Sequence, residues 1–344
     1  MNKEKKIRGV NLGGWLVLEK WMTPSLFEGL KAVDETTFCQ ELGPKAEERL
    51  RKHWETFITE EDFKWLANVD INAVRIPVGH WIFGDTKPYV GAIDVLDWAV
   101  KTASRYGIGV LLDLHAAPGC QNGFDNGGIM GVMEWHKHPE NVARSLDVIE
   151  RLAQRYAVYD NVIGVELLNE PRWDVPEDIL KDYYIRGYER VRKHMNEDVA
   201  VVIHDGFRPL IWDGFMSEPE FSNVILDTHM YQCFTDEDKN KDVLGHVEKA
   251  LKRKEELYEI GRQLPTYVGE WSLGLDGNSL RGLSTFQKEA AMRAFGSSQL
   301  LGYENAAGWF FWSYKIEVDS NNEWKCQWDF RECVKRGWLP HRYI

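Results

Sequence analysis

The segment that decides the fold reads NVIGVELLNEP and occupies residues 161–171. It is an apolar run of strand length that ends in an acid, Glu170. A second such run, LPTYVGEW at residues 264–271, brings Glu270 to the same relative position. A buried carboxylate without a partner is costly, so we expect both acids to face a cleft rather than the core. The two segments therefore predict strands that carry functional acids at their carboxyl ends.

Strand-like and helix-like segments alternate on both sides of these two runs. We expect eight strands, at residues 7–12, 71–78, 107–115, 162–169, 199–204, 223–231, 265–270 and 307–312. Amphipathic stretches separate most of them, for example residues 93–106, 139–156, 178–195, 243–261 and 283–301. Without a linker or repeat, this α/β pattern predicts a (β/α)8 TIM barrel, a single catalytic domain over residues 1–344. A doubly wound open sheet is the alternative, which the lack of G-x-G-x-x-G after the first strand disfavours.

Polar or aromatic residues lie near the carboxyl end of each predicted strand from the second to the eighth. On a barrel these ends converge on one mouth, where the active sites of this fold lie. A lone histidine there, such as His115 or His229, is about as often structural as functional, and Arg75 could simply pair with Asp113. Glu170 and Glu270 differ, since a structural role for both would need two separate buried ion pairs, which are rarely net stabilising.

Two carboxylates converging on one cleft are the minimal machinery for breaking a glycosidic bond. The sequence therefore indicates an O-glycosyl hydrolase. A metal site built from His115, His229 and the two glutamates is a competing interpretation. No two of these residues share a helix at a spacing of three or four, and the aromatic context suits sugar binding better. We expect neither metal nor other cofactor.

Composition excludes some partners. The net charge of −12 leaves no basic surplus to neutralise phosphates, which argues against nucleic acid. No stretch is long and apolar enough to span a membrane, and the N-terminus has no apolar signal core. The five cysteines are irregularly spaced, which indicates mostly free thiols. We expect a monomer that is cytoplasmic, or secreted after loss of a signal peptide.

The residues at the strand ends resemble glycoside hydrolase family 5, whose acid/base signature is the triplet at residues 169–171. Three further segments are similar to the exo-β-1,3-glucanases of that family, known mainly from yeasts and fungi. They are RGVNLGGWLVLE at residues 8–19, DLHAAPGCQNGFDNG at residues 113–127 and GWFFWSYK at residues 308–315. The resemblance extends over nearly the whole chain. The segment at residues 272–277 departs from the fungal pattern, which leaves the linkage preference open.

The resemblance implies a role for each site residue. Glu170 would be the acid/base and Glu270 the nucleophile, with Arg75 beneath it and Tyr231 hydrogen-bonded to it. Glu19, His115 and His229 would bind hydroxyl groups of the terminal glucose, and Asn169 its 2-hydroxyl group. Asn126 would be a further substrate-binding residue. Aromatic contacts would come from Trp312 as a stacking floor and from Phe124 and Phe234 as a clamp on the next sugar.

The chemistry predicts retention of configuration, with the two carboxyl groups roughly 5 Å apart. We expect Arg75 and Tyr231 to keep the pKa of Glu270 low, and the opposing carboxylate to raise that of Glu170. The substrate would be a laminarin-type β-glucan from which the enzyme releases glucose, and β-1,6 linkages are a second candidate. An endo-β-1,4-glucanase, a β-glucosidase and a non-catalytic carbohydrate-binding barrel remain alternatives. Long loops at residues 15–42 and 118–135 would form the rim of the site.

Overall fold

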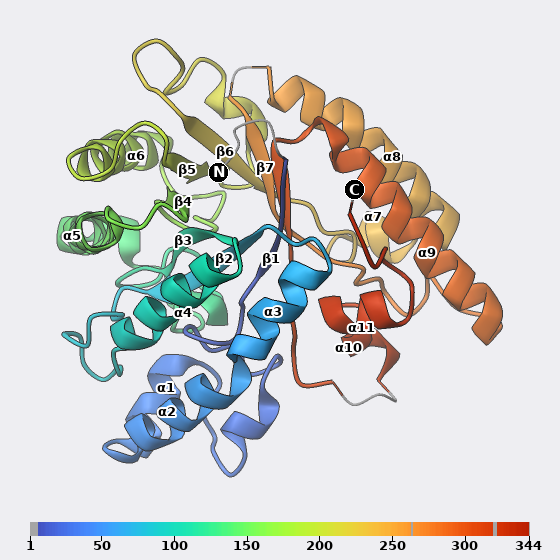
Figure 1. Cartoon of the computed structure of the whole chain (residues 1–344), viewed down its shortest axis with the longest axis horizontal. Coiled ribbons are helices and arrows are strands. Elements are labelled where there is room, and N and C mark those ends of the chain that lie inside the picture. The colour runs from blue at the N-terminus through green and yellow to red at the C-terminus, as the bar shows by residue number, and fades with distance from the viewer. Residues whose placement is uncertain (1–5, 263, 319–321, 344) are drawn as a thin grey trace.

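The structure is a computed structural model that describes residues 6–262, 264–318 and 322–343. Its centre is a closed barrel of parallel strands that follow one another in chain order. This confirms the predicted TIM barrel, and helices surround the strands (Figure 1). The strands are β1 (Ile7–Asn11), β2 (Ala73–Gly79), β3 (Gly109–Ala116), β4 (Val162–Glu166), β5 (Ala200–His204), β6 (Val224–His229), β7 (Thr266–Trp271) and β8 (Gly308–Phe311). Pairing of Ile7 with Gly308 begins the contact between β1 and β8 that closes the ring.

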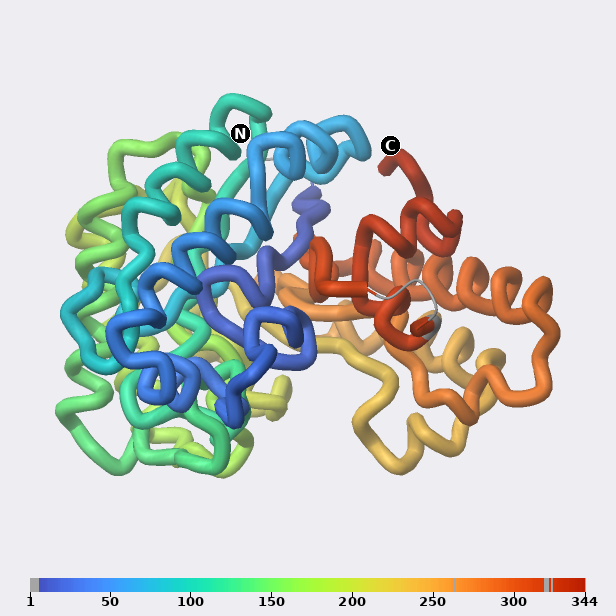
Figure 2. The backbone as a smooth tube through the Cα atoms, turned by 90° about the horizontal axis from the view of Figure 1, so that it is seen from below, coloured from blue at the N-terminus to red at the C-terminus, as the bar shows by residue number. Residues whose placement is uncertain are grey.

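The helices lie outside the barrel (Figure 2), and α-helices connect most consecutive strands, except β5 and β6. Their bounds are α1 (Glu35–Leu42), α2 (Lys45–Phe57), α3 (Glu60–Asn68), α4 (Ile93–Arg105), α5 (Pro139–Tyr156), α6 (Glu177–Arg192), α7 (Asp236–Lys239), α8 (Val243–Ile260), α9 (Thr285–Gly302), α10 (Glu323–Cys326) and α11 (Phe330–Lys335). The five helical stretches named from the sequence correspond to α4, α5, α6, α8 and α9. None of the helices in the described residues is long and apolar enough to cross a membrane.

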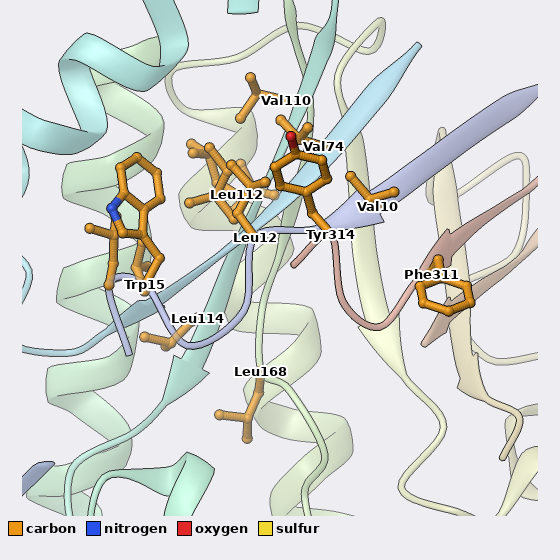
Figure 3. Packing of buried hydrophobic residues seen from close by; sticks show 14 of the residues in the cluster. Val10, Leu12, Trp15, Val74, Val110, Leu112, Leu114, Leu168, Phe311 and Tyr314 are labelled. Atoms are coloured by element: carbon orange, nitrogen blue, oxygen red, sulfur yellow. The ribbon is translucent and has the colours of Figure 1, made fainter. Parts of the chain in front are cut away.

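Two apolar layers hold the barrel together because successive strand residues point to opposite faces. Outward residues such as Val74 and Leu112 pack beneath the helices (Figure 3). Inward residues such as Leu111, Val202 and Phe310 fill the amino-terminal half of the barrel. The polar side chains lie above this inner apolar layer, toward the carboxyl ends of the strands. The inner layer therefore forms the floor of the site.

Most strands end one to three residues from the predicted position, and the difference is largest at β4. β4 ends at Glu166, so Asn169 and Glu170 lie in the loop that follows. Glu170 adopts a φ of 42°, in the left-handed region that non-glycine residues rarely occupy. β8 ends at Phe311, one residue before Trp312. The loop conformation turns the Glu170 side chain back over the barrel, which a continuing strand would not allow.

Candidate active site

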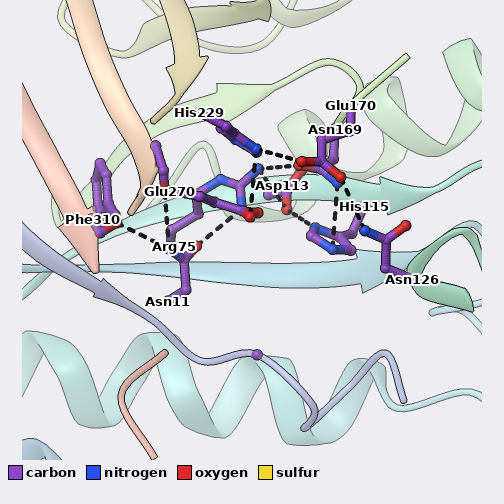
Figure 4. Close-up of polar contacts among 12 residues, drawn as sticks. Asn11, Arg75, Asp113, His115, Asn126, Asn169, Glu170, His229, Glu270 and Phe310 are labelled. Atoms are coloured by element: carbon purple, nitrogen blue, oxygen red, sulfur yellow. Dashed lines mark hydrogen bonds and ion pairs between the residues drawn. The ribbon is translucent and has the colours of Figure 1, made fainter. Parts of the chain in front are cut away.

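Side chains from several strands meet at the carboxyl end of the barrel (Figure 4). Figure 4 shows Glu170, Glu270, His229 and Arg75 close together above the strands. Both glutamates are largely buried, at 4% and 7% exposure. The structure thus brings together the two acids that the sequence placed at the ends of the fourth and seventh strands.

The Glu270 carboxylate is held from two directions. Arg75 Nη1 donates to Oε1 at 3.1 Å, and the Tyr231 hydroxyl donates to Oε2 at 2.7 Å. Nδ1 of His229 lies 3.4 Å from Oε2. These contacts fix the orientation of the carboxylate, which is what an attacking nucleophile requires.

The Glu170 carboxylate has its own two donors. His229 Nδ1 donates to Oε1 at 2.8 Å, and Asn126 Nδ2 donates to Oε2 at 3.1 Å. Because Glu170 and Glu270 contact the same nitrogen, their nearest oxygens lie at most about 6 Å apart, below the roughly 6.5–9.5 Å between the carboxyl groups of inverting glycosidases. This limit agrees with the retaining geometry that we expected.

The predicted order of the two pKa values is wrong for the free site. Burial raises the pKa of Glu270 to about 7, and the charges of His229 and Arg75 oppose it only in part. Burial also raises the pKa of Glu170, but the hydrogen bond and charge of His229 outweigh it and leave that pKa below its usual value. The pKa of His229 lies well above its usual value, because Glu270, Asp227 and Glu170 outweigh the effect of burial. The proton that Glu170 was expected to carry therefore resides on His229.

All five N–H groups of Arg75 donate hydrogen bonds to side chains around it. Nε and Nη2 donate to the two oxygens of Glu166 at 2.6 and 3.0 Å. Nη1 also donates to Asn11 Oδ1 at 3.0 Å, and Nη2 to Asn169 Oδ1 at 2.7 Å. The proposed pairing with Asp113 is present as well, at 3.2 Å. Sequence reasoning missed Glu166 and Asn11, although an acid inside the apolar run at residues 162–168 was a visible signal for the first.

His115 and Trp312 form the wall nearest to Asn169. The two rings stack with centroids 5.5 Å apart, and both side chains are buried. His115 Nδ1 donates to Asp113 Oδ2 at 2.6 Å, which leaves Nε2 facing Asn169 Nδ2 at 3.4 Å. Asp113 therefore fixes the tautomer of His115, whose Nε2 is an acceptor that faces Asn169.

Asp227 supports the opposite side of the site. Its Oδ1 accepts from the backbone N–H of Gly269 at 2.6 Å, and its Oδ2 lies 3.4 Å from His229 Nε2. A Cβ atom at position 269 would stand 1.9 Å from that carboxylate. Only glycine fits at position 269, because the Asp227 carboxylate lies against the backbone there.

Three predicted substrate-binding residues, Glu19, Phe124 and Phe234, lie farther from the two catalytic acids. Glu19 is buried and accepts from Trp21 Nε1 at 2.8 Å. Phe124 and Phe234 are exposed, at 37% and 65%, and Phe234 packs on Tyr231 at 5.3 Å. Among the described residues the structure records no ring contact between Phe124 and Phe234, and a clamp on a sugar would need a gap between them. The clamp stays a prediction.

Two groups of possible metal ligands occur within the described residues: Glu170, His204 and His229, and Glu166, Asp227 and His229. Neither includes His115. Nδ1 of His204 accepts from the backbone N–H of Gly206 at 2.9 Å, so its proton is on Nε2, and a protonated nitrogen cannot bind a metal. His229 faces an acid at each nitrogen, and these acids raise its pKa well above the usual value.

In a closed parallel barrel, two carboxylates whose nearest oxygens are at most about 6 Å apart, one in the loop after the fourth strand and one on the seventh strand, define a glycoside hydrolase of the retaining kind. The comparison with known families agrees. Residues 39–318 match the cellulase model of glycosyl hydrolase family 5, and the chain belongs to that family.

Similar curated proteins cover nearly the whole chain. A probable glucan 1,3-beta-glucosidase A from Aspergillus niger is 39% identical over 98% of this chain and 88% of its own length. A glucan 1,3-beta-glucosidase from Blumeria graminis is 37% identical over 98% of this chain and 87% of its own length.

Solved structures share the fold. A rutinosidase from Aspergillus niger has a TM-score of 0.85 at 23% identity and covers 98% of both chains. An endoglucanase from Thermotoga maritima has a TM-score of 0.60 at 16% identity, with 96% of each chain covered.

Proposed function

We propose that this protein is a retaining exo-β-1,3-glucosidase that releases glucose from laminarin-type β-glucans. The observation that carries the proposal is the position of Glu170 and Glu270, whose carboxylates both contact Nδ1 of His229. The names of the curated relatives support the linkage and the substrate. The contacts of the surrounding residues support the roles that follow.

In the first step Glu270 attacks the anomeric carbon while the leaving oxygen is protonated. Arg75 and Tyr231 orient the attacking carboxylate. The proton comes from the pair formed by His229 and Glu170, which share it across 2.8 Å. As the substrate enters, this proton moves to Glu170, which passes it to the glycosidic oxygen.

In the second step water replaces the departed sugar. Glu170, now an anion, takes a proton from the water, which attacks the glucosyl–Glu270 ester. The ester bond breaks, Glu270 is restored, and glucose leaves with its β configuration. Asn126 and His229 keep the Glu170 carboxylate in place through both steps.

The surrounding residues suit a single terminal glucose. Trp312 offers an apolar face to the sugar ring, and Asn169, held by Arg75, is placed to bind the 2-hydroxyl group. Nε2 of His115 and the carboxylate of Glu19 are available for other hydroxyl groups. The names of the curated relatives support recognition of a chain end, and Phe124 and Phe234 would hold the next sugar.

Proton NMR of laminarin digestion from the first seconds tests linkage, mode and stereochemistry together. We expect β-glucose as the main early product. A ladder of oligosaccharides would mean an endo enzyme, and early α-glucose an inverting one. No product from laminarin, together with turnover of cellulose or of small glucosides, would replace the proposed substrate.

We also propose that the protein acts as a monomer, either in the cytoplasm or after secretion. Light scattering coupled to size-exclusion chromatography tests the first part. A mass near 80 kDa, twice the 40.0 kDa of the chain, would show a dimer instead.

A further inference from the structure

Glu166 is a buried acid at the end of β4, four residues before Glu170. Its side chain has no solvent exposure and points into the barrel. Its two oxygens accept from Nε and Nη2 of Arg75 at 2.6 and 3.0 Å. This is the two-pronged geometry in which a carboxylate fixes the plane of a guanidinium group as well as its position.

The plane of Arg75 matters because the other edge of the guanidinium serves the reaction. Nη1 donates to Glu270 Oε1 at 3.1 Å, and Nη2 donates to Asn169 Oδ1 at 2.7 Å. A rotation of the guanidinium about its own axis would break both contacts at once. Both hydrogen bonds that the Glu166 carboxylate accepts come from Arg75. Its charge also lies near Asp227 and His229, within 4.8 Å, so action through Arg75 must be separated from a direct effect on His229.

Asp113 does not supply the same restraint. Its Oδ2 lies 3.2 Å from Arg75 Nη2 and is shared with the shorter hydrogen bond from His115. Its Oδ1 has no hydrogen-bond partner among the described residues. A contact through one oxygen balances charge but leaves the guanidinium free to turn.

We propose that Glu166 is a positioning residue that fixes the plane of Arg75 and thereby orients both Glu270 and Asn169. The proposal rests on the function proposed above, in which these two residues attack the sugar and bind its 2-hydroxyl group. A purely stabilising role fits less well, because a buried ion pair contributes little net stability compared with apolar packing.

The test compares Glu166→Gln with wild type on 2,4-dinitrophenyl β-glucoside, with active sites counted by a 2-deoxy-2-fluoroglucoside that traps the covalent intermediate. Glutamine keeps the shape but turns an N–H₂ group toward Arg75. We expect kcat per active site to fall by roughly 10²-fold, the size of effect that a 1 Å misplacement produces, with KM changed less than about 3-fold. An unchanged kcat would overturn the proposal.

A double-mutant cycle separates action through Arg75 from a general structural effect. In an Arg75→Met background no guanidinium remains to be positioned, so Glu166→Gln should change kcat by less than about 3-fold. Equal losses in both backgrounds would contradict the proposal. Glu166→Asp serves as the second variant, and if neither single variant folds by circular dichroism, Glu166 is structural and the proposal is wrong.

Asp62→Asn is the matched control. Asp62 is a buried acid outside the site that accepts from Lys315 Nζ at 2.9 Å and from the Tyr314 hydroxyl at 2.7 Å. We expect this variant to lose thermal stability while kcat stays at the wild-type value. The test uses an aryl glucoside, so its result does not depend on the linkage. If the wild-type protein hydrolyses the aryl glucoside but not laminarin, the proposed β-1,3 linkage is wrong and the test of Glu166 is still valid.

Discussion

Nδ1 of His229 lies 2.8 Å from Oε1 of Glu170, and the proton between them belongs mainly to the histidine in the free site. The same nitrogen is 3.4 Å from Glu270. In the free site the pKa of the nucleophile Glu270 is therefore raised and that of the acid Glu170 is lowered. A simple acid and nucleophile would show the reverse order. This relationship makes the pH dependence of the enzyme informative.

We expect kcat/KM to rise as the pH increases through about 7, because Glu270 attacks only as an anion and burial raises its pKa to about 7. At higher pH the rate should fall when the pair of His229 and Glu170 loses its shared proton. Initial rates on an aryl β-glucoside across the pH range measure both limbs. An acid limb near the usual glutamate value of about 4.5 would show that the charges of His229 and Arg75 outweigh burial.

Glu170→Gln provides a control for this assignment. The Glu170 charge is one of the groups that raise the pKa of Glu270. Removing it should move the acid limb to lower pH, measured on the first step with 2,4-dinitrophenyl β-glucoside. An acid limb that stays in place would mean that it belongs to another group.

The two glutamates should fail in different ways when replaced by alanine. Glu270→Ala should lose several orders of magnitude in rate on every substrate while still binding glucan. Glu170→Ala should keep the first step on 2,4-dinitrophenyl β-glucoside, whose leaving group needs no proton, and added azide should then give β-glucosyl azide. Near-normal laminarin hydrolysis by both variants, or an α-glucosyl azide, is incompatible with the assigned roles.

Phe124 and Phe234 should affect long substrates only. If their exposed rings hold the second sugar, replacing either with alanine should raise KM for laminari-oligosaccharides roughly 10-fold, from the loss of one stacking contact. KM for an aryl glucoside should change little. Phe286→Ala, at a 79% exposed position on α9, is the matched control. Equal effects of all three variants would leave no case for a clamp.

Stability should fall on the acid side because of buried neutral histidines. Burial lowers the pKa of His53 to about 4, and its Nε2 donates to the carbonyl of Gly14 at 2.9 Å. The unfolded chain takes up the proton near pH 6.5, so this residue makes the free energy of unfolding fall by about 1.4 kcal/mol per pH unit between roughly 6.5 and 4. Urea unfolding at several pH values should show a smaller slope for His53→Gln, which keeps a donor for Gly14. An identical slope would contradict this account.

The sequence predicted the barrel because the periodicities of its strands and helices are locally encoded. All eight strands lie where the alternation placed them, within a few residues. The short helices α10 and α11 were not predicted, since four to six residues carry too little periodicity. The end of β4 was misjudged because nothing in the sequence shows that Glu170 turns into the left-handed region.

For the site, residue types and strand order were enough to name the residues that meet. They could not give the balance between burial and charge that decides each pKa. Whether burial or the charges of Arg75 and His229 dominates at Glu270 depends on depth and distance, which only three-dimensional structure provides. Glu166 was overlooked for a similar reason, since its partner is 91 residues away in the chain.

The five N–H groups of Arg75 join residues from distant parts of the ring, Asn11 on β1, Glu166 on β4 and Glu270 on β7. These strands come together only when β8 has joined β1. The first and last strands of the chain must therefore meet before the catalytic acids are aligned. Recovery of glucosidase activity during refolding would report closure of the ring itself, and would lag behind any signal from helix formation.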